Sequence, residues 1–288
     1  MMACFMLLSA SPGAPQEQPL FLDSQSSIKT GGFRVSFKVH SPLANLHALA
    51  NRMDIALGLA RYPDYYYNLK DETFEIYVPE NYDPKTSYGL IVNISPSDSG
   101  GLPWPDLPPD LEKRKLIWIG ANNSGNQQNV HTRRIPLALD AAYNMMKICK
   151  INPHRVYLSG ISGGGRVSSM AAFHYSDVFS GGIFMIGVNY WAAMPIPSKP
   201  DRAWPKGFNK PDVKYLSQAC NTGRYVFLTG DNDGNREQTY EYYMKGYKKC
   251  LKYALYLQVP KMGHERPPLD WYEKALDFLD NPQTEKEK

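Results

Sequence analysis

The chain has 288 residues, of which 43% are hydrophobic and 21% charged, enough to bury a sizeable core in one large α/β domain or two small ones. Its 32 basic and 28 acidic residues nearly cancel and form no basic block, so a nucleic-acid partner is not expected. No run approaches the roughly 20 apolar residues that a membrane span requires, and none is expected.

The two ends of the chain are predicted to lie outside the folded domain. Residues 1–27 hold a short apolar core followed by small and polar residues, which is typical of the end of a secretory signal or of an unstructured leader and linker. We therefore expect a secreted or periplasmic protein, with a cytoplasmic one as the alternative. Residues 283–288 form a charged tail, and residues 28–282 are predicted to form one domain without internal repeats.

The pattern of apolar residues predicts strands alternating with helices after an antiparallel entry. Half-buried strands are indicated at 33–39 and 72–79, with a helix between them at 45–59. Further strands, several of them continuous apolar runs typical of a parallel sheet, follow at 88–94, 115–120, 155–158, 182–187, 225–229 and 254–259. Helices are predicted at 134–147, 167–175, 236–250 and 270–279. This order predicts a doubly wound, mostly parallel sheet with helices on both faces.

The cysteines allow one internal disulfide. Cys220 and Cys250 each precede a predicted strand by a few residues, so a bridge between them is an open option. Cys149 is interpreted as a small buried hydrophobic residue, and Cys4 belongs to the leader.

The segment Gly160-Ile161-Ser162-Gly163-Gly164 has the G-x-S-x-G pattern of a nucleophile elbow between a strand and a helix. A serine on so tight a turn has close backbone neighbours on both sides, which favours glycine two positions away. The turn lifts the hydroxyl above the edge of the sheet. Ser162 is therefore the candidate nucleophile.

A serine nucleophile requires a base and an orienting carboxylate, which an α/β sheet supplies from loops after later strands. His264 follows the last predicted strand and is the candidate base. Asp231 and Asp233 follow the preceding strand, and either could cap the next helix. We prefer Asp233 because it lies far enough beyond Gly230 to turn back toward the histidine.

The oxyanion of an acyl-transfer reaction requires backbone donors. The N–H of Gly163 follows the nucleophile directly and is one candidate. The second is predicted after the 88–94 strand, where Pro96 lacks an N–H and Ser97 is the nearest donor. No metal, cofactor or phosphate-binding motif is found, because Arg166 follows the glycines where a P-loop requires Lys and Ser or Thr.

Two further segments are candidates for substrate binding. The polar loop after the 115–120 strand contains Asn122 and Asn123, either of which could hold a substrate hydroxyl or belong to a hydrated turn. The long Pro-rich and aromatic segment 189–220 is predicted to be a lid-like excursion, and its Trp191 could line a cleft or pack the sheet.

The residues from Ile151 to Gly164, INPHRVYLSGISGG, resemble a block found in the polyhydroxybutyrate depolymerase and feruloyl or acetyl-xylan esterase branch of the α/β-hydrolases. The loops at 230–233 and 263–264 are similar to that branch's acid and base positions. The resemblance implies a monomeric, often exported serine esterase that acts on plant polysaccharide esters or on polyester. It departs from the family at Ser95-Pro96, where the family commonly carries His-Gly before its first oxyanion donor.

We therefore predict a serine esterase that works through an acyl-enzyme on a small-molecule or polysaccharide ester, as a monomer or small homo-oligomer. One alternative is a serine peptidase of the prolyl oligopeptidase-like type. Another, of a different class, is an inactive carbohydrate-binding protein on a hydrolase fold.

Overall fold

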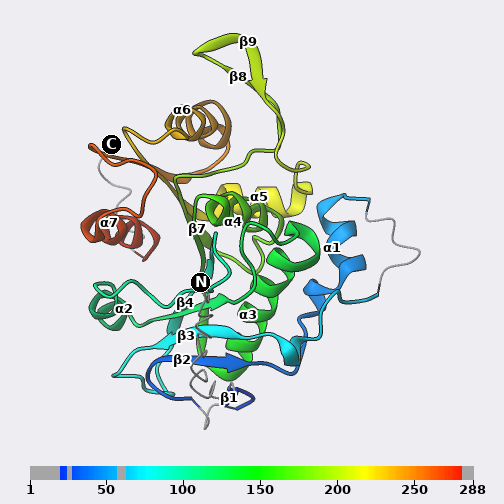
Figure 1. Ribbon diagram of the computed structural model, residues 1–288, viewed down its shortest axis with the longest axis vertical. Helices are drawn as coiled ribbons and strands as arrows, with labels where there is room; N and C mark the ends of the chain where they lie inside the picture. Colours follow the sequence, from blue (N-terminus) through cyan, green and yellow to red (C-terminus); the bar gives the residue numbers. More distant parts are fainter. Residues whose placement is uncertain (1–19, 25–27, 57–62, 281–288) are drawn as a thin grey trace, which may run out of the picture.

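The computed structural model describes residues 20–24, 28–56 and 63–280, and its centre is a nine-stranded mixed sheet (Figure 1). In this sheet only β3 runs against its two neighbours, and every other pairing is parallel. In spatial order the strands are β1 (Leu20–Phe21), β2 (Gly31–Ser36), β3 (Phe74–Val78), β5 (Leu116–Ala121), β4 (Tyr88–Ile94), β6 (Ile151–Ile161), β7 (Gly181–Met185), β10 (Arg224–Gly230) and β11 (Tyr253–Val259).

Helices cover both faces of the sheet, as Figure 1 shows, so the predicted α/β class with antiparallel N-terminal strands is confirmed. Helices α2 and α7 lie on one face, and α1, α3, α4 and α5 lie on the other (Figure 1). The helices are α1 (Leu46–Met53), α2 (Pro108–Arg114), α3 (Ile135–Ile148), α4 (Gly163–His174), α5 (Val213–Thr222), α6 (Arg236–Glu241) and α7 (Leu269–Asp280).

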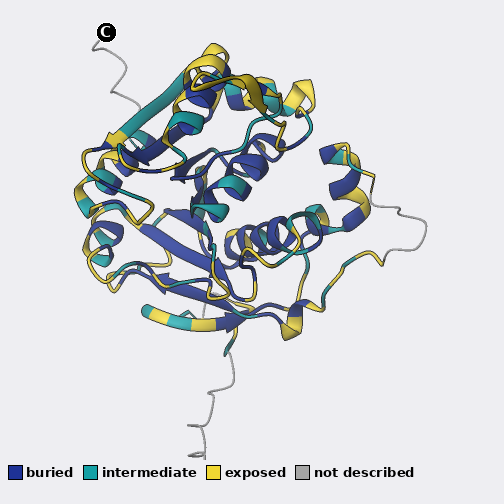
Figure 2. Ribbon diagram, turned by 45° about the horizontal axis from the view of Figure 1, so that its top comes forward, coloured by how far each residue is buried: buried dark blue, intermediate teal, exposed yellow. Residues whose placement is uncertain are grey.

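Successive residues of the central strands enter two different cores, which is why these strands contain apolar runs. In β4, Leu90 and Val92 pack on the α3 and α4 face, whereas Ile91 between them packs on the α2 and α7 face. All residues of β5 and all residues of β4 except Asn93 are accordingly buried, as the dark ribbons of Figure 2 show. A strand covered by helices on both sides needs apolar residues at every position.

The order of the strands creates a switch point between β4 and β6. The chain passes from β4 to β5 on one side and returns to β6 on the other side. The loops after β4 and β6 therefore diverge and leave a crevice at the carboxyl edge of the sheet, where open α/β sheets bind their ligands. Ser95 follows β4 and Ser162 follows β6.

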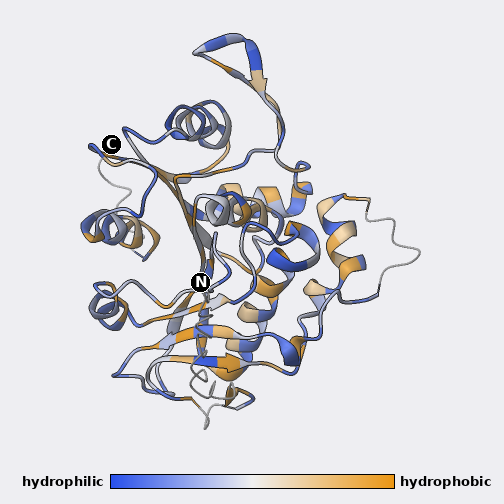
Figure 3. Cartoon of the chain, viewed as in Figure 1, coloured by the Kyte–Doolittle hydropathy of each residue, from blue (hydrophilic) through white to orange (hydrophobic). Residues whose placement is uncertain are grey.

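The excursion predicted over 189–220 contains a two-stranded antiparallel hairpin, β8 (Met194–Ile196) and β9 (Lys199–Trp204), and ends in α5. The hairpin projects from the body of the molecule, and Figure 3 shows hydrophilic residues toward its tip. Its residues Lys199 to Arg202 are exposed. Helix α5 instead packs against α4, so the end of the segment, from Val213 onward, is part of the helical layer.

Cys220 of α5 is bonded to Cys250 just before β11, with Cα atoms 5.3 Å apart. This disulfide is the option that the sequence left open, and Cys149 is free and buried as predicted. No helix in the described part of the chain is long and apolar enough to cross a membrane. The predicted leader (apart from residues 20–24), Cys4, the end of the 45–59 helix and the charged tail lie outside the described residues.

Candidate active site

Ser162 is held at the turn between β6 and α4 in a backbone conformation that residues other than glycine rarely adopt, with φ 54° and ψ −119°. Its N–H donates to the carbonyl of Met185 at 2.8 Å, which fixes the turn to the end of β7. A Cβ at Gly160 would lie 2.5 Å from the backbone of Gly164, and one at Gly164 would overlap the carbonyl of Ile94. The two glycines therefore allow strand, turn and helix to pack in contact, as the sequence pattern predicts.

The side chains of Ser162, His264 and Asp233 form one hydrogen-bonded line. Nε2 of His264 lies 2.8 Å from Oγ of Ser162, and Nδ1 lies 2.8 Å from Oδ1 of Asp233. The imidazole comes from the loop after β11 and is about half exposed, with 48% of its side chain accessible. The structure thus brings together the three residues that were predicted from loops far apart in the sequence.

The carboxylate of Asp233 is fully buried and has partners on both oxygens. Oδ1 accepts the N–H of Asn235 at 3.2 Å in addition to His264, and Oδ2 accepts the Thr229 hydroxyl at 3.0 Å. Asp231 points elsewhere, and its Oδ1 is buried with no hydrogen-bond partner among the described residues. Of the two predicted alternatives, Asp233 is the one that contacts the histidine.

Of the two predicted oxyanion donors, the N–H of Gly163 is free within the described residues and the N–H of Ser97 is already hydrogen-bonded. Gly163 is the first residue of α4, so its N–H has no acceptor inside the helix and lies at the positive end of the helix dipole. The N–H of Ser97 instead donates to the hydroxyl of Ser95 at 3.1 Å. The Ser97 amide is therefore already engaged, and the prediction of a free second donor at this residue does not match the geometry.

The predicted substrate contacts also have other partners. Asn122 is buried, accepts the N–H of Gly100 and donates to Thr73 and Glu75, so its carboxamide holds loops together and is not free for a substrate. The ring of Trp191 contacts a cluster of core aromatic side chains, Phe173, Tyr190, Phe208 and Tyr247. Asn123 is exposed beside the site, and its role as a substrate contact stays a prediction.

A buried arginine that the sequence did not single out clamps the two loops beside the elbow. Arg134 is 3% exposed, and its guanidinium donates to the carbonyl of Ser95 at 2.9 Å and to that of Ser124 at 2.8 Å. Burial lowers the pKa of Arg134 to about 10. Its position at the start of α3 made it look like an ordinary helix-terminal cation, so the sequence held no signal for this role.

A second arginine connects α4, the helix that follows Ser162, to the loop that carries Asp233. Arg166, one turn into α4, donates to the carbonyl of Val188 and to the side chains of Asn189, Asn235 and Gln238, at 2.7 to 3.2 Å. Burial lowers its pKa. Because Asn235 also donates its backbone N–H to Asp233, Arg166 connects the helix of the serine to the loop of the acid.

Comparison with known proteins gives structural matches only, since no family model and no curated protein matches the sequence. FphF, a fluorophosphonate-binding serine hydrolase of Staphylococcus aureus, is 12% identical over 87% of this chain and 100% of its own, with a TM-score of 0.55. A truncated carbohydrate esterase from gut microbiota is 14% identical over 74% of this chain and 92% of its own, with a TM-score of 0.52.

Dipeptidyl peptidase 4 of Porphyromonas gingivalis is similar to the same degree, with 15% identity and a TM-score of 0.51 over 73% of this chain. The present chain spans only about a third of that protein, because the match covers 33% of its length. The chain has the α/β-hydrolase fold. At these identities the α/β-hydrolase likeness concerns the fold, and it extends to esterases and to peptidases alike.

Within the described residues no three or more His, Cys, Asp or Glu side chains are placed to hold a metal ion. Ser162, His264 and Asp233 lie together at the carboxyl edge of the sheet.

Proposed function

We propose that this protein is a serine hydrolase that cleaves carboxylic esters through an acyl-enzyme. The observation that carries the proposal is the line of two 2.8 Å hydrogen bonds from Ser162 through His264 to the buried Asp233. A serine hydroxyl is a weak nucleophile unless a neighbouring base takes its proton, and the base is effective only in the correct tautomer. Asp233, accepting from Nδ1, leaves Nε2 free to act on the serine.

The reaction follows from this arrangement. His264 Nε2 takes the proton of Ser162 Oγ as that oxygen attacks the ester carbonyl, and the Gly163 N–H binds the oxyanion that forms. His264 then gives the proton to the departing alcohol, which leaves Ser162 acylated. A water molecule, deprotonated by His264, attacks the acyl group; the bond to Ser162 Oγ breaks, His264 returns the proton to this oxygen, and the acid is released.

The substrate is proposed to be an acetyl or feruloyl ester on a plant polysaccharide, or a polyester. The resemblance of the 151–164 segment to esterases of that kind supports this choice. A serine peptidase of prolyl oligopeptidase-like type has comparable support from the dipeptidyl peptidase likeness, so it is kept as the second candidate.

The exposure of His264 is compatible with a large substrate, because nearly half of its side chain is accessible. Secretion, and a monomeric or small homo-oligomeric state, are proposed along with the esterase function and rest on the sequence resemblance.

The test combines one variant with a substrate panel. Ser162→Ala should abolish hydrolysis of p-nitrophenyl acetate and labelling by a fluorophosphonate probe, while the circular dichroism spectrum stays unchanged. Acetylated xylan, methyl ferulate, a short polyester and a dipeptide p-nitroanilide then separate the ester and peptide candidates by their kcat/KM. Turnover that survives in Ser162→Ala would refute the hydrolase, and a chain that is inactive and unlabelled before mutation would favour the inactive binding protein.

A further inference from the structure

The candidate site has one clear backbone donor for an oxyanion and lacks the second that was expected. Gly163 offers its N–H at the start of α4, but the N–H of Ser97 is bonded to Ser95. Three residues further along the same loop, the N–H of Gly100 donates to Asn122 at 2.8 Å. Because the loss of one oxyanion donor typically costs on the order of 100-fold or more in turnover, the source of the second donor matters.

The loop after β5 reaches the elbow by lying across the loop after β4. The N–H of Asn126 donates to the carbonyl of Pro96 at 2.9 Å, and the N–H of Asn123 donates to that of Asp98 at 2.6 Å. Gly125 permits this contact, since a Cβ there would lie 2.7 Å from the carbonyl carbon of Ser97. Arg134 links the two loops through its hydrogen bonds to the carbonyls of Ser95 and Ser124.

The crossing places the side chain of Asn126 directly on Gly163. A Cβ at Gly163 would overlap this carboxamide, whose Oδ1 is the nearest atom, whose carbon lies 2.7 Å and whose Nδ2 lies 3.0 Å from the Cβ position. Any larger residue after the nucleophile would thus displace Asn126. The absence of a side chain at 163 allows the carboxamide to lie against Gly163, the residue whose N–H is the candidate oxyanion donor.

The carboxamide of Asn126 is also free to donate. Asn126 is exposed, and its side chain has no hydrogen-bond partner within the described ranges. A primary amide carries two N–H donors and one acceptor, and its oxygen and nitrogen can exchange places by a flip of the side chain. The group can therefore turn an N–H toward the carbonyl oxygen of a substrate bound to Ser162.

We propose that Asn126 is a catalytic residue that supplies the second hydrogen-bond donor to the oxyanion, in place of a backbone amide of the Ser95-Pro96-Ser97 loop. This inference rests on the proposed hydrolase function. It assigns a reason to the departure at Ser95-Pro96, because the loop serves as the support for Asn126 through the carbonyl of Pro96.

The test is the kinetics of Asn126→Ala and Asn126→Asp with p-nitrophenyl acetate. A donor that acts on the transition state should lower kcat by about 100- to 1,000-fold with KM changed less than about threefold. Binding of phenylboronic acid, which forms a tetrahedral adduct with an active serine, should weaken by a similar factor to kcat/KM. Gln127→Ala, an exposed neighbour in the same loop, is the control and should keep wild-type kinetics.

Gly163→Ala gives a second, independent test of the role of Asn126, because its methyl group would displace the Asn126 carboxamide. It should reduce kcat to about the level of Asn126→Ala, and the double variant should be no slower than either single one. Wild-type kcat in Asn126→Ala, or a loss confined to KM, would overturn the assignment while Ser162→Ala still abolishes turnover. Activity that persists in Ser162→Ala would instead refute the hydrolase function itself.

Discussion

Two aspartates follow β10, and their surroundings give them different chemistry. Asp233 has a fully buried carboxylate bound to His264, Thr229 and the N–H of Asn235. A carboxylate held by several donors is fixed in place, which is what the orienting member of a triad requires. Asp231 has no such donors on its buried oxygen. The assignment of the acid therefore rests on hydrogen bonds, not on the distance along the chain.

Asp233→Asn and Asp231→Asn form a matched pair. Replacing Asp233 should lower kcat for p-nitrophenyl acetate by about 10⁴-fold, because the amide favours the wrong tautomer of His264. The same change at Asp231 should cost less than about tenfold. Steady-state kinetics of the two purified variants distinguishes them, and equal losses would contradict the role of Asp233.

For single residues, the sequence predicts which side chains come together but not the direction of the backbone N–H donors. Ser162, Asp233 and His264 could be predicted because the loops after parallel strands gather at one edge. The Ser97 amide could not, since its direction depends on a turn closed by the Ser95 hydroxyl. Asn126 was missed because its reach to Gly163 depends on how one loop crosses another.

Helix α4 carries the nucleophile at one end and a buried histidine at the other. His174 is fully buried, and its Nε2 donates to the carbonyl of Asn209 at 3.1 Å, so the helix end anchors the segment that follows the β8–β9 hairpin. Burial lowers the pKa of His174 to about 4, against an ordinary value near 6.5. The neutral imidazole is thus a structural part of the helix packing.

His174→Gln should remove a component of the acid sensitivity of the fold. Between pH 6.5 and 4 the unfolded chain binds a proton at His174 that the folded protein does not, so stability falls as the pH falls through this window. The free energy of unfolding of the wild type should drop by about 2–3 kcal/mol more than that of the variant between pH 7.5 and 4.5. Urea unfolding at both pH values measures the difference, and parallel losses would contradict it.

Elements with a strong apolar pattern could be predicted, and those set by packing could not. The 88–94 run is β4 at the same boundaries, because all residues of this central strand except Asn93 are buried. The predicted 236–250 helix is instead α6 followed by a wider turn at 242–246 and a tighter one at 247–249. Helix α2 was missed, since its short Pro-Pro start resembles a loop.

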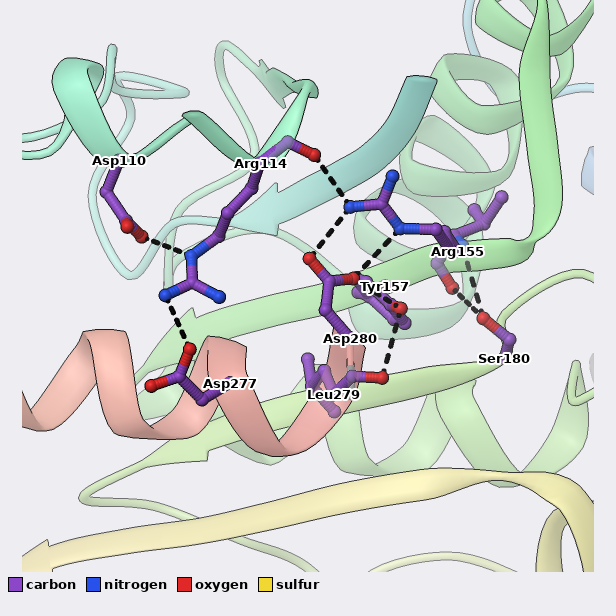
Figure 4. Close-up of polar contacts among 9 residues, drawn as sticks. Asp110, Arg114, Arg155, Tyr157, Ser180, Asp277, Leu279 and Asp280 are labelled. Atoms are coloured by element: carbon purple, nitrogen blue, oxygen red, sulfur yellow. Dashed lines mark hydrogen bonds and ion pairs between the residues drawn. The ribbon is translucent and has the colours of Figure 1, made fainter. Parts of the chain in front are cut away.

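The two edges of the sheet differ in role: one carries the candidate site and the other stabilises the fold. The carboxyl edge carries the candidate site, and the amino edge carries a polar seam that attaches α7 (Figure 4). There Arg155 at the base of β6 binds Asp280 and the carbonyl of Arg114, and Tyr157 also donates to Asp280. Arg155 lies seven residues before Ser162, roughly 20 Å along the strand.

Asp280→Asn should therefore weaken the fold and leave the reaction untouched. Asp280 is mostly buried, with 14% of its side chain exposed, so its loss leaves the Arg155 cation without a counter-charge. We expect a decrease of about 2 kcal/mol in the free energy of unfolding and an unchanged kcat/KM. Asp277→Asn is the control, because its ion pair with Arg114 is 64% exposed on the Asp277 side and should contribute less than about 1 kcal/mol. Similar stability of the two variants would argue against the seam.

The overall architecture follows from the alternation of strands and helices along the chain, which fixes a parallel sheet with two covered faces. What the sequence did not reveal is the content of the 189–220 segment, where the hairpin and α5 have different surroundings. Helix α5 is amphipathic and is linked to Cys250, just before β11, by a disulfide that spans 30 residues of sequence. The sequence left this disulfide as an option, whereas the packing of α5 on α4 was not predicted.

The left-handed backbone of Ser162 has a consequence for engineering. A non-glycine residue in so sparsely populated a conformation costs of order 1–3 kcal/mol, and glycine would adopt the same turn with less strain. A library screened for heat resistance alone should therefore enrich glycine at position 162 and yield sturdier, inert proteins. Thermostable variants of this chain must be selected on turnover and melting temperature together, because at this residue the two properties oppose each other.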